Sequence, residues 1–174
     1  MKKIIALLTF VIASLFAEVN REQPLPTITL QGDTGGHYNG DTWDSSALQG
    51  KTTMLMYVDP DEKSKGEIFK PTIEALEKDL DFSRFQILVI LNLDATWKPN
   101  AVIRSMMKSK VTDYPKRTYI LDNSSVLVKN WGLQDDEYNT LLINDEGRVI
   151  YSHSGEWTDD EMKQIDSLIR LHVK

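Results

Sequence analysis

The sequence contains no cysteine among its 174 residues. Thiol–disulfide exchange and thiol-based peroxide reduction both need a sulfur nucleophile, and no other side chain replaces it. The isolated chain is therefore excluded from both activities. The same absence rules out a lipid-modified cysteine and a stabilising disulfide, so packing alone has to stabilise the fold.

Positive charge is also scarce, because 20 Lys and Arg residues stand against 26 Asp and Glu residues, for a net charge of −6. A chain of this kind is a poor nucleic-acid binder, since phosphate neutralisation needs clustered Lys and Arg. The basic stretches, such as 108–110 and 116–117, are short and interleaved with acids, and they are interpreted as solvated surface. His37, His153 and His172 fall in different segments, which argues against a zinc site.

No apolar run is long enough for a membrane-spanning helix, which needs about 20 residues. The one candidate, 4–16, has 13 residues and lies between Met1-Lys2-Lys3 and Ala17-Glu18. This pattern predicts a signal peptide over 1–17, with an uncleaved anchor or a buried helix as the alternatives. We therefore expect a soluble, exported protein whose mature form has no membrane span.

Three domain-level segments are expected: the signal peptide 1–17, an extended lead-in over 18–26, and a single domain over 27–174. Within the domain, 27–30 and 37–43 are predicted to pair as a hairpin, and 44–48 to form one helical turn. Further strands are predicted at 52–58, 85–93, 117–121, 138–143 and 149–151. Helices are predicted over about 69–80, after Pro99, over 123–131, and from the capping box of Thr158 and Glu161 onward.

This order of elements predicts an α/β sandwich with a mixed central sheet, helices on both faces and an N-terminal hairpin extension. The continuous apolar runs at 52–58 and 85–93 indicate central strands that are buried on both faces.

The order of the predicted elements and several short sequence segments resemble those of the thioredoxin-like superfamily. Ala47-Leu48-Gln49-Gly50-Lys51 is similar to the entry to its reactive-sulfur strand, and 140–151 is similar to its closing hairpin. Within it the chain resembles the YtfJ family of small exported bacterial proteins, through Thr42-Trp43-Asp44-Ser45, Tyr114-Pro115 and Asp145-Glu146-Gly147-Arg148-Val149. That resemblance implies a periplasmic protein of thioredoxin-like fold whose role is not established, and it transfers no catalytic residue.

Two departures from the superfamily stand out. Its reactive sulfur would fall near Glu62, and the place of its cis-proline is occupied by Tyr138 or its neighbour Glu137. Both halves of the redox site are therefore missing.

Candidate site residues gather where central strands end. Asp59, Asp61 and Glu62 follow the strand that ends at Val58, and Asp94 follows the next one. Ligands bind at the carboxyl ends of strands in open α/β sheets, so these residues and Tyr138 are predicted to line a ligand or partner cleft. A divalent-cation site is the alternative, but the spacing matches no calcium loop, and an exposed acidic loop is favoured. We assign no catalytic residue, metal or cofactor.

Four tryptophans lie at the ends of predicted elements. The favoured interpretation is that each covers a sheet edge or a helix end, and the alternative makes Trp97 a loop anchor for a partner.

The sequence thus favours a thioredoxin-like protein that binds an envelope protein or a small ligand. The alternatives are an oxidoreductase or antioxidant protein that uses a partner's thiol or a borrowed cofactor, and a cation-binding or structural protein of the envelope.

Overall fold

The computed structural model describes residues 24–173. The predicted signal peptide and residues 18–23 of the predicted lead-in lie outside this range. The strands are β1 (Thr29–Leu30), β2 (Gly35–His37), β3 (Trp43–Asp44), β4 (Thr52–Val58), β5 (Phe85–Asn92), β6 (Arg117–Asp122), β7 (Tyr138–Ile143) and β8 (Val149–Ser154). The α-helices are α1 (Lys70–Asp79), α2 (Asn100–Asp113), α3 (Val126–Trp131) and α4 (Asp159–His172), and 3-10 helices cover Gly32–Thr34, Ser45–Leu48 and Lys63–Phe69.

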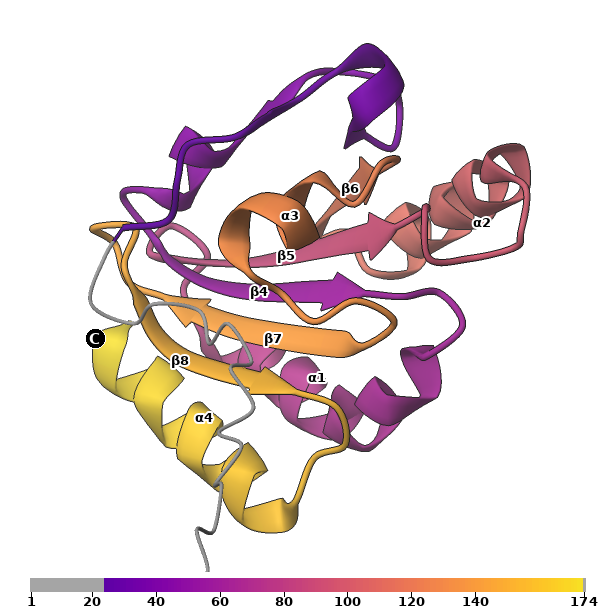
Figure 1. The fold of residues 1–174 in the computed structure, drawn as a ribbon. Coiled ribbons are helices and arrows are strands. Elements are labelled where there is room, and N and C mark those ends of the chain that lie inside the picture. Colours follow the sequence, from indigo (N-terminus) through magenta and orange to yellow (C-terminus); the bar gives the residue numbers. More distant parts are fainter. Residues whose placement is uncertain (1–23, 174) are drawn as a thin grey trace, which may run out of the picture.

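Six strands form one mixed sheet in the order β2-β6-β5-β4-β7-β8 (Figure 1). β4, β5 and β6 are parallel, whereas β2, β7 and β8 pair antiparallel to their neighbours. All seven residues of β4 are buried, as its continuous apolar sequence predicts. The predicted mixed sheet and α/β sandwich are confirmed.

Side chains of β4 alternate between two cores because successive residues of a strand point to opposite faces. Met54, Met56 and Val58 join the core that α1, α2 and α4 cover. Leu55 and Tyr57 join the core that α3 and the β1–β3 sheet cover. In Figure 1, α3 lies in front of the strands and α1 behind them, so helices cover both faces as predicted.

The predicted N-terminal hairpin forms only in part. β1 pairs with β3 in a separate two-stranded sheet, whereas the residues between them include β2, which adds to the edge of the main sheet beside β6. Gly35 and Gly36 permit this crossing, because a Cβ on Gly35 would lie 2.0 Å from the carbonyl oxygen of Leu121. Glycine at these positions is what allows the backbone of β2 to approach β6 closely.

Several helices begin or end where local sequence signals indicate. Pro71 lies in the first turn of α1, where a missing N–H is harmless, and so it opens this helix instead of kinking it. Thr158 and Glu161 form the predicted capping box of α4. Gly132 ends α3 in the left-handed conformation, with φ of 69°.

Candidate functional site

The turn after β4 contains two aspartates in opposite environments. Asp59 is buried, with 4% of its surface exposed, and its Oδ1 accepts a hydrogen bond of 2.8 Å from the backbone N–H of Asp61. Burial raises the pKa of the Asp59 carboxyl. The interpretation of this segment as an exposed acidic loop is therefore wrong for Asp59.

Asp61 is exposed and joins two loops at the carboxyl end of the sheet. Its carboxylate accepts a hydrogen bond of 2.9 Å from Thr96 Oγ1 and pairs with the Lys98 ammonium group. The hydrogen bond from Lys98 is the main cause that lowers the pKa of Asp61. The loops that follow β4 and β5 are thereby held together.

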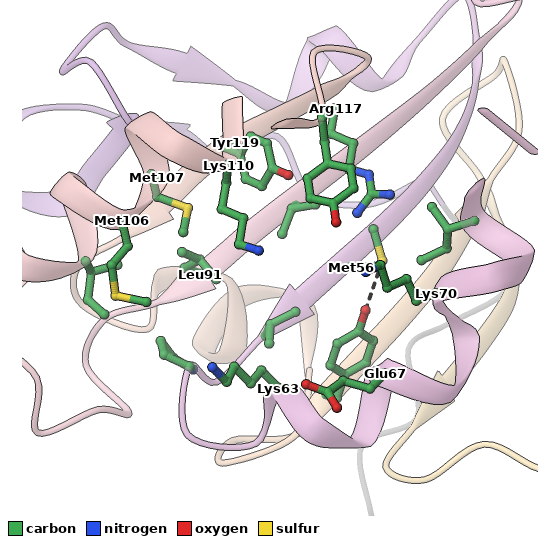
Figure 2. Close-up of a pocket in the computed structure, with 18 of the residues that line it drawn as sticks. Met56, Lys63, Glu67, Lys70, Leu91, Met106, Met107, Lys110, Arg117 and Tyr119 are labelled. Atoms are coloured by element: carbon green, nitrogen blue, oxygen red, sulfur yellow. Dashed lines mark hydrogen bonds between the residues drawn. The ribbon is translucent and has the colours of Figure 1, made fainter. Parts of the chain in front are cut away.

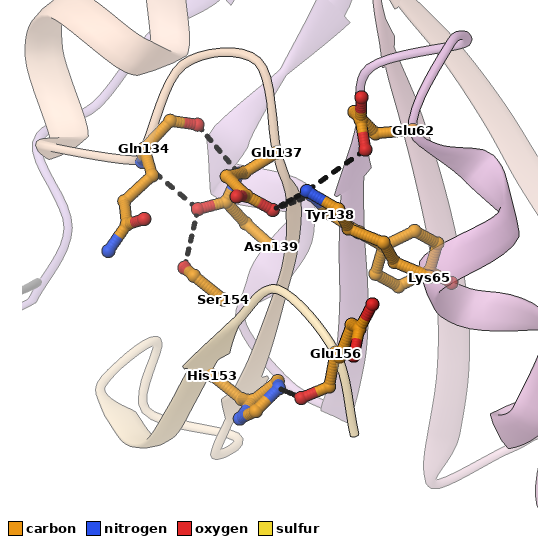
Figure 3. A network of polar contacts seen from close by, with 9 residues as sticks. All are labelled: Glu62, Lys65, Gln134, Glu137, Tyr138, Asn139, His153, Ser154 and Glu156. Carbon is orange, nitrogen blue, oxygen red and sulfur yellow. Dashed lines mark hydrogen bonds and ion pairs between the residues drawn. The ribbon is translucent and has the colours of Figure 1, made fainter.

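Glu62 lies opposite the loop that precedes β7, and Lys65 connects them (Figure 3). Lys65 Nζ is 2.9 Å from Glu62 Oε2 and 2.8 Å from Glu137 Oε2. These contacts, with the hydrogen bond to Glu137 first, raise the pKa of Lys65 above its usual range. A lysine between two carboxylates therefore occupies the segment where the sequence resemblance predicts the missing redox site.

Asn139 fixes the loop that carries Glu137 (Figure 3). Its side chain accepts from the Gln134 backbone N–H at 3.0 Å and from Ser154 Oγ at 2.8 Å, and it donates to the Gln134 carbonyl at 2.8 Å. Since Asn139 is 1% exposed, this network is held inside the fold.

Tyr138 packs directly on the 3-10 helix Lys63–Phe69. A Cβ on Gly66 would lie 2.2 Å from Tyr138 Cε2, so the ring requires a glycine there. The Tyr138 hydroxyl donates to Met56 Sδ at 3.0 Å, and burial raises the pKa of this phenol. Tyr138 is thus a buried side chain that packs between β4 and the 3-10 helix, and it is not an exposed acid or base.

Asp94 does not join the other candidates. Its Oδ2 accepts a hydrogen bond of 3.2 Å from Ser125 Oγ, and its backbone N–H donates to Asn92 Oδ1. Ser125 directly precedes α3, on the other face of the sheet from α1 and α2. Asp94 thus contacts the α3 side of the sheet, and it is not among the residues that line the pocket described below. Residues 24–173 contain no group of three His, Asp or Glu side chains arranged to hold a metal ion.

A pocket of about 550 Å³ opens beside these residues, between the segment 63–73 and α2 (Figure 2). Its floor is apolar and comes from the sheet, through Met56, Val58, Val89, Leu91 and Tyr119. Its helical walls carry Lys63, Lys70, Ile103, Met106, Met107 and Lys110. This volume lies within the range of small-molecule sites, about 300–1,000 Å³.

Several of these residues are absent from the sequence-based candidate set. Lys110 and Arg117 were interpreted as solvated surface, yet both line the pocket. The sequence did contain a signal for the α2 wall of the pocket. Met106 and Lys110 lie four residues apart, so an apolar and a basic side chain share one helix face. Tyr138 is the predicted candidate that also lines this pocket.

Trp43, Trp131 and Trp157 are buried, as expected for side chains that cover sheet edges and helix ends. Trp97 is 83% exposed, so the favoured interpretation is wrong for this residue. Three further exposed apolar side chains, Ile68, Val102 and Met106, belong to the two segments that form the pocket walls.

Comparisons with known proteins agree with this fold. Residues 21–172 match the model of a family described as bacterial protein of unknown function (YtfJ_HI0045). The uncharacterized protein YtfJ of Escherichia coli is 27% identical over 135 residues, which cover 76% of this chain and 73% of that protein.

Solved structures of thioredoxin-like proteins are similar in fold. The exposed lipoprotein thioredoxin Etrx1 of Streptococcus pneumoniae has a TM-score of 0.61 at 18% identity, covering 82% of this chain and 99% of that one. A thiol-disulfide isomerase from Corynebacterium glutamicum has a TM-score of 0.59 at 13% identity, covering 82% and 95%. The chain therefore has a thioredoxin-like fold. Across residues 24–173, none of the helices has the length and apolar character needed to cross a membrane.

Proposed function

This chain belongs to the bacterial YtfJ_HI0045 family, and from that premise we propose that it is a periplasmic binding protein that performs no thiol chemistry of its own. Its ligand site is the pocket between the segment 63–73 and α2. The observation that carries the proposal is this pocket of about 550 Å³, which has an apolar floor and polar groups at its walls.

Two features support a binding role over catalysis. The chain has no cysteine, and Lys65 with its two carboxylates occupies the segment where the resemblance to thioredoxin-like proteins predicts the redox site. The charged groups there are engaged with one another in two ion pairs, whereas the pocket beside them stays open. Export is supported by the N-terminal sequence pattern of Lys2, Lys3 and the apolar run 4–16.

A pocket-filling substitution tests this proposal. Met106 lines the pocket and is 44% exposed, so Met106→Trp fills the space without disturbing the buried core. Val102 lies one turn earlier on α2, is 47% exposed and does not line the pocket, which makes Val102→Trp the matched control.

Purified wild type and both variants are screened by thermal shift against fractionated small molecules from a bacterial envelope extract. A ligand that binds the folded state raises the melting temperature. We expect fractions that stabilise the wild type and the Val102 variant but not the Met106 variant. If no fraction separates the variants in this way, the pocket is not the binding site.

The oxidoreductase alternative is tested on the same material. We expect no disulfide reduction and no peroxide turnover above the buffer rate, and no flavin or haem absorption. Turnover by the isolated polypeptide would overturn the binding-protein proposal.

A protein partner is a second candidate, and the exposure of Trp97 favours it. Large aromatic side chains dominate the energetics of protein interfaces. A photo-crosslinking amino acid at position 97 is expected to capture one defined envelope protein, whereas the same group at exposed Leu171 on α4 captures none. Equal labelling from both positions would exclude Trp97 as an anchor.

A further inference from the structure

The charge of the pocket is opposite to that of the chain. Five cationic side chains line it, against the single carboxylate of Glu67; the five are Lys63, Lys70, Lys98, Lys110 and Arg117. The lining thus carries a surplus of four positive charges on a chain of net charge −6. Such a local reversal concentrates anions at the pocket.

Three of these cations already have carboxylate partners outside the lining. Arg117 binds Glu77 through two hydrogen bonds of 2.6 and 3.1 Å, and Lys98 pairs with Asp61. Lys70 lies 3.7 Å from Glu74. These three help to shape the pocket, and each has a carboxylate within ion-pair distance.

Lys63 and Lys110 differ from the other three. Among residues 24–173, no carboxylate lies within ion-pair distance of either ammonium group. Lys110 Nζ lies 5.4 Å from the centre of the Tyr114 ring, which orients it without neutralising it. In Figure 2, Lys110 extends from α2 toward the middle of the pocket, and Lys63 lies on the opposite side.

The rest of the lining suits an extended apolar group. Met106 and Met107 stand on the α2 wall, and Leu91 and Val89 form part of the floor. Methionine side chains are flexible and polarisable, so they adapt to ligands of different shape. A ligand whose apolar part packs on this surface would have its charged head group beside the lysines.

We propose that this pocket binds an organic anion with an extended apolar body, whose head group lies between Lys63 and Lys110. The inference rests on the proposed function, because it concerns the same pocket. The recognised chemistry is an anionic head on an alkyl chain, which a carboxylate and a phosphate monoester share.

The first experiment compares decyl probes that differ only in the head group, each below its micelle concentration. Decanoate and decyl phosphate carry the anion, 1-decanol is neutral, and decyltrimethylammonium is cationic. In calorimetric titrations we expect one or both anions to bind at least tenfold more tightly than decanol, and the cation not to bind. The affinity of the anion should fall with added salt, because screening weakens charge attraction.

Methyl NMR of labelled methionine locates the bound probe. The signals of Met56, Met106 and Met107, which line the pocket, are expected to shift. Met54 and Met162 do not line it, and their signals serve as controls inside the same molecule. Shifts confined to the controls would overturn the proposed location.

Lysine variants test the head-group contacts. Lys63 and Lys110 are both exposed, so Lys63→Gln and Lys110→Gln should leave the fold intact. We expect each to weaken decanoate or decyl phosphate roughly fivefold, and decanol not at all. Lys108→Gln removes the same charge from an exposed position on the same helix that does not line the pocket, and it should leave the affinity unchanged.

The outcomes separate this inference from the proposed function. If decanol or the cation binds as tightly as the anions and shifts the signals of the pocket methionines, the proposed preference for an anion is wrong. The proposal that the pocket binds a ligand is then kept. If no probe binds, the inference is overturned, while the Met106→Trp screen judges the proposed function on its own. Equal weakening by Lys108→Gln would also overturn it, because the charge would then act only at long range.

Discussion

The two faces of the sheet treat their polar groups differently. On the face covered by α3, the carboxylate of Asp122 is fully buried and accepts hydrogen bonds from Tyr57 Oη at 3.1 Å and from the backbone N–H groups of Val126 and Leu127 at 2.9 Å. Ser125 Oγ donates to Asn92 Oδ1 at 3.0 Å. Burial, together with the Asp122 charge, raises the pKa of Tyr57, which keeps its hydroxyl a donor.

On the face covered by α1 and α2, fewer of the polar groups have strong hydrogen-bond or ion-pair partners. Lys63 and Lys110 lack carboxylate partners among the described residues, and the Tyr138 hydroxyl meets only the weak acceptor Met56 Sδ. The pocket lies on this face. The difference teaches that both faces carry a packed core, but only on the α3 face do buried polar groups satisfy one another, whereas the other face has an open pocket with two lysines that lack carboxylate partners among the described residues.

The largest expected effect is on the face covered by α3. Asp122→Ala leaves buried backbone donors of α3 without an acceptor, and we expect a loss of about 4 kcal/mol in the free energy of unfolding, measured by urea denaturation. Asp160→Ala, at a side chain that is 95% exposed, is the control and should change stability by less than about 0.5 kcal/mol. A loss below about 1 kcal/mol for Asp122→Ala would break the contrast between the faces.

The next effect is at the wall of the pocket. Gly66→Ala forces a Cβ against the Tyr138 ring, and we expect a loss of about 2 kcal/mol in the free energy of unfolding. In a Tyr138→Ala background the same substitution should be almost neutral, because the clashing ring is gone. A double-mutant cycle with no coupling between these positions would show that the contact is not tight.

Two tyrosine variants compare the faces directly. Tyr57→Phe removes a donor from buried Asp122 and should lower the free energy of unfolding by about 1.5 kcal/mol. Tyr138→Phe removes only a contact with sulfur and should lower it by less than about 0.5 kcal/mol. Equal losses in chemical denaturation would contradict the assigned difference.

The smallest effect concerns Asp59 and has the opposite sign. Because burial raises the pKa of this carboxyl, the folded state holds its proton more tightly than the unfolded chain does. Ionisation of Asp59 therefore lowers stability as the pH rises above its unfolded pKa of about 4, and the penalty is absent below that pH.

Asp59→Asn removes this penalty while its Oδ1 still accepts from Asp61. We expect a gain of about 0.5 kcal/mol at pH 7, a small value because the hydrogen bond from the Asp61 N–H offsets part of the cost of burying this charge. The gain should vanish near pH 3, when stability of both proteins is followed by thermal unfolding. A gain that is independent of pH would exclude ionisation as its cause.

Local signals predicted the elements well because they act within a few residues. The apolar run of β4 and the capping box at Thr158 each describe a local backbone preference, and the structure confirms both. Pro71 could either open or kink its helix, and the structure shows that it opens it. The hairpin at 27–43 was wrong in part, since β2 finds a better partner in β6, more than 80 residues away.

The site was less predictable because it depends on contacts between distant segments. Asp94 follows a neighbouring strand, as expected, but Ser125 binds it on the other face. Lys63 and Lys110 come from segments that are far apart in sequence, and a basic residue in an acidic chain gives no sign of whether a carboxylate will meet it. Their shared pocket emerges only when the sheet places the two walls opposite each other.

The ion pairs of Lys65 also indicate how a thiol introduced beside this lysine would behave. A cysteine in place of Glu62 would lie beside an ammonium group that already contacts this position at 2.9 Å. A neighbouring cation lowers the pKa of a thiol and favours its reactive anion. The engineered variant Glu62→Cys should therefore be alkylated faster than an ordinary surface thiol, because the ammonium group of Lys65 favours the thiolate.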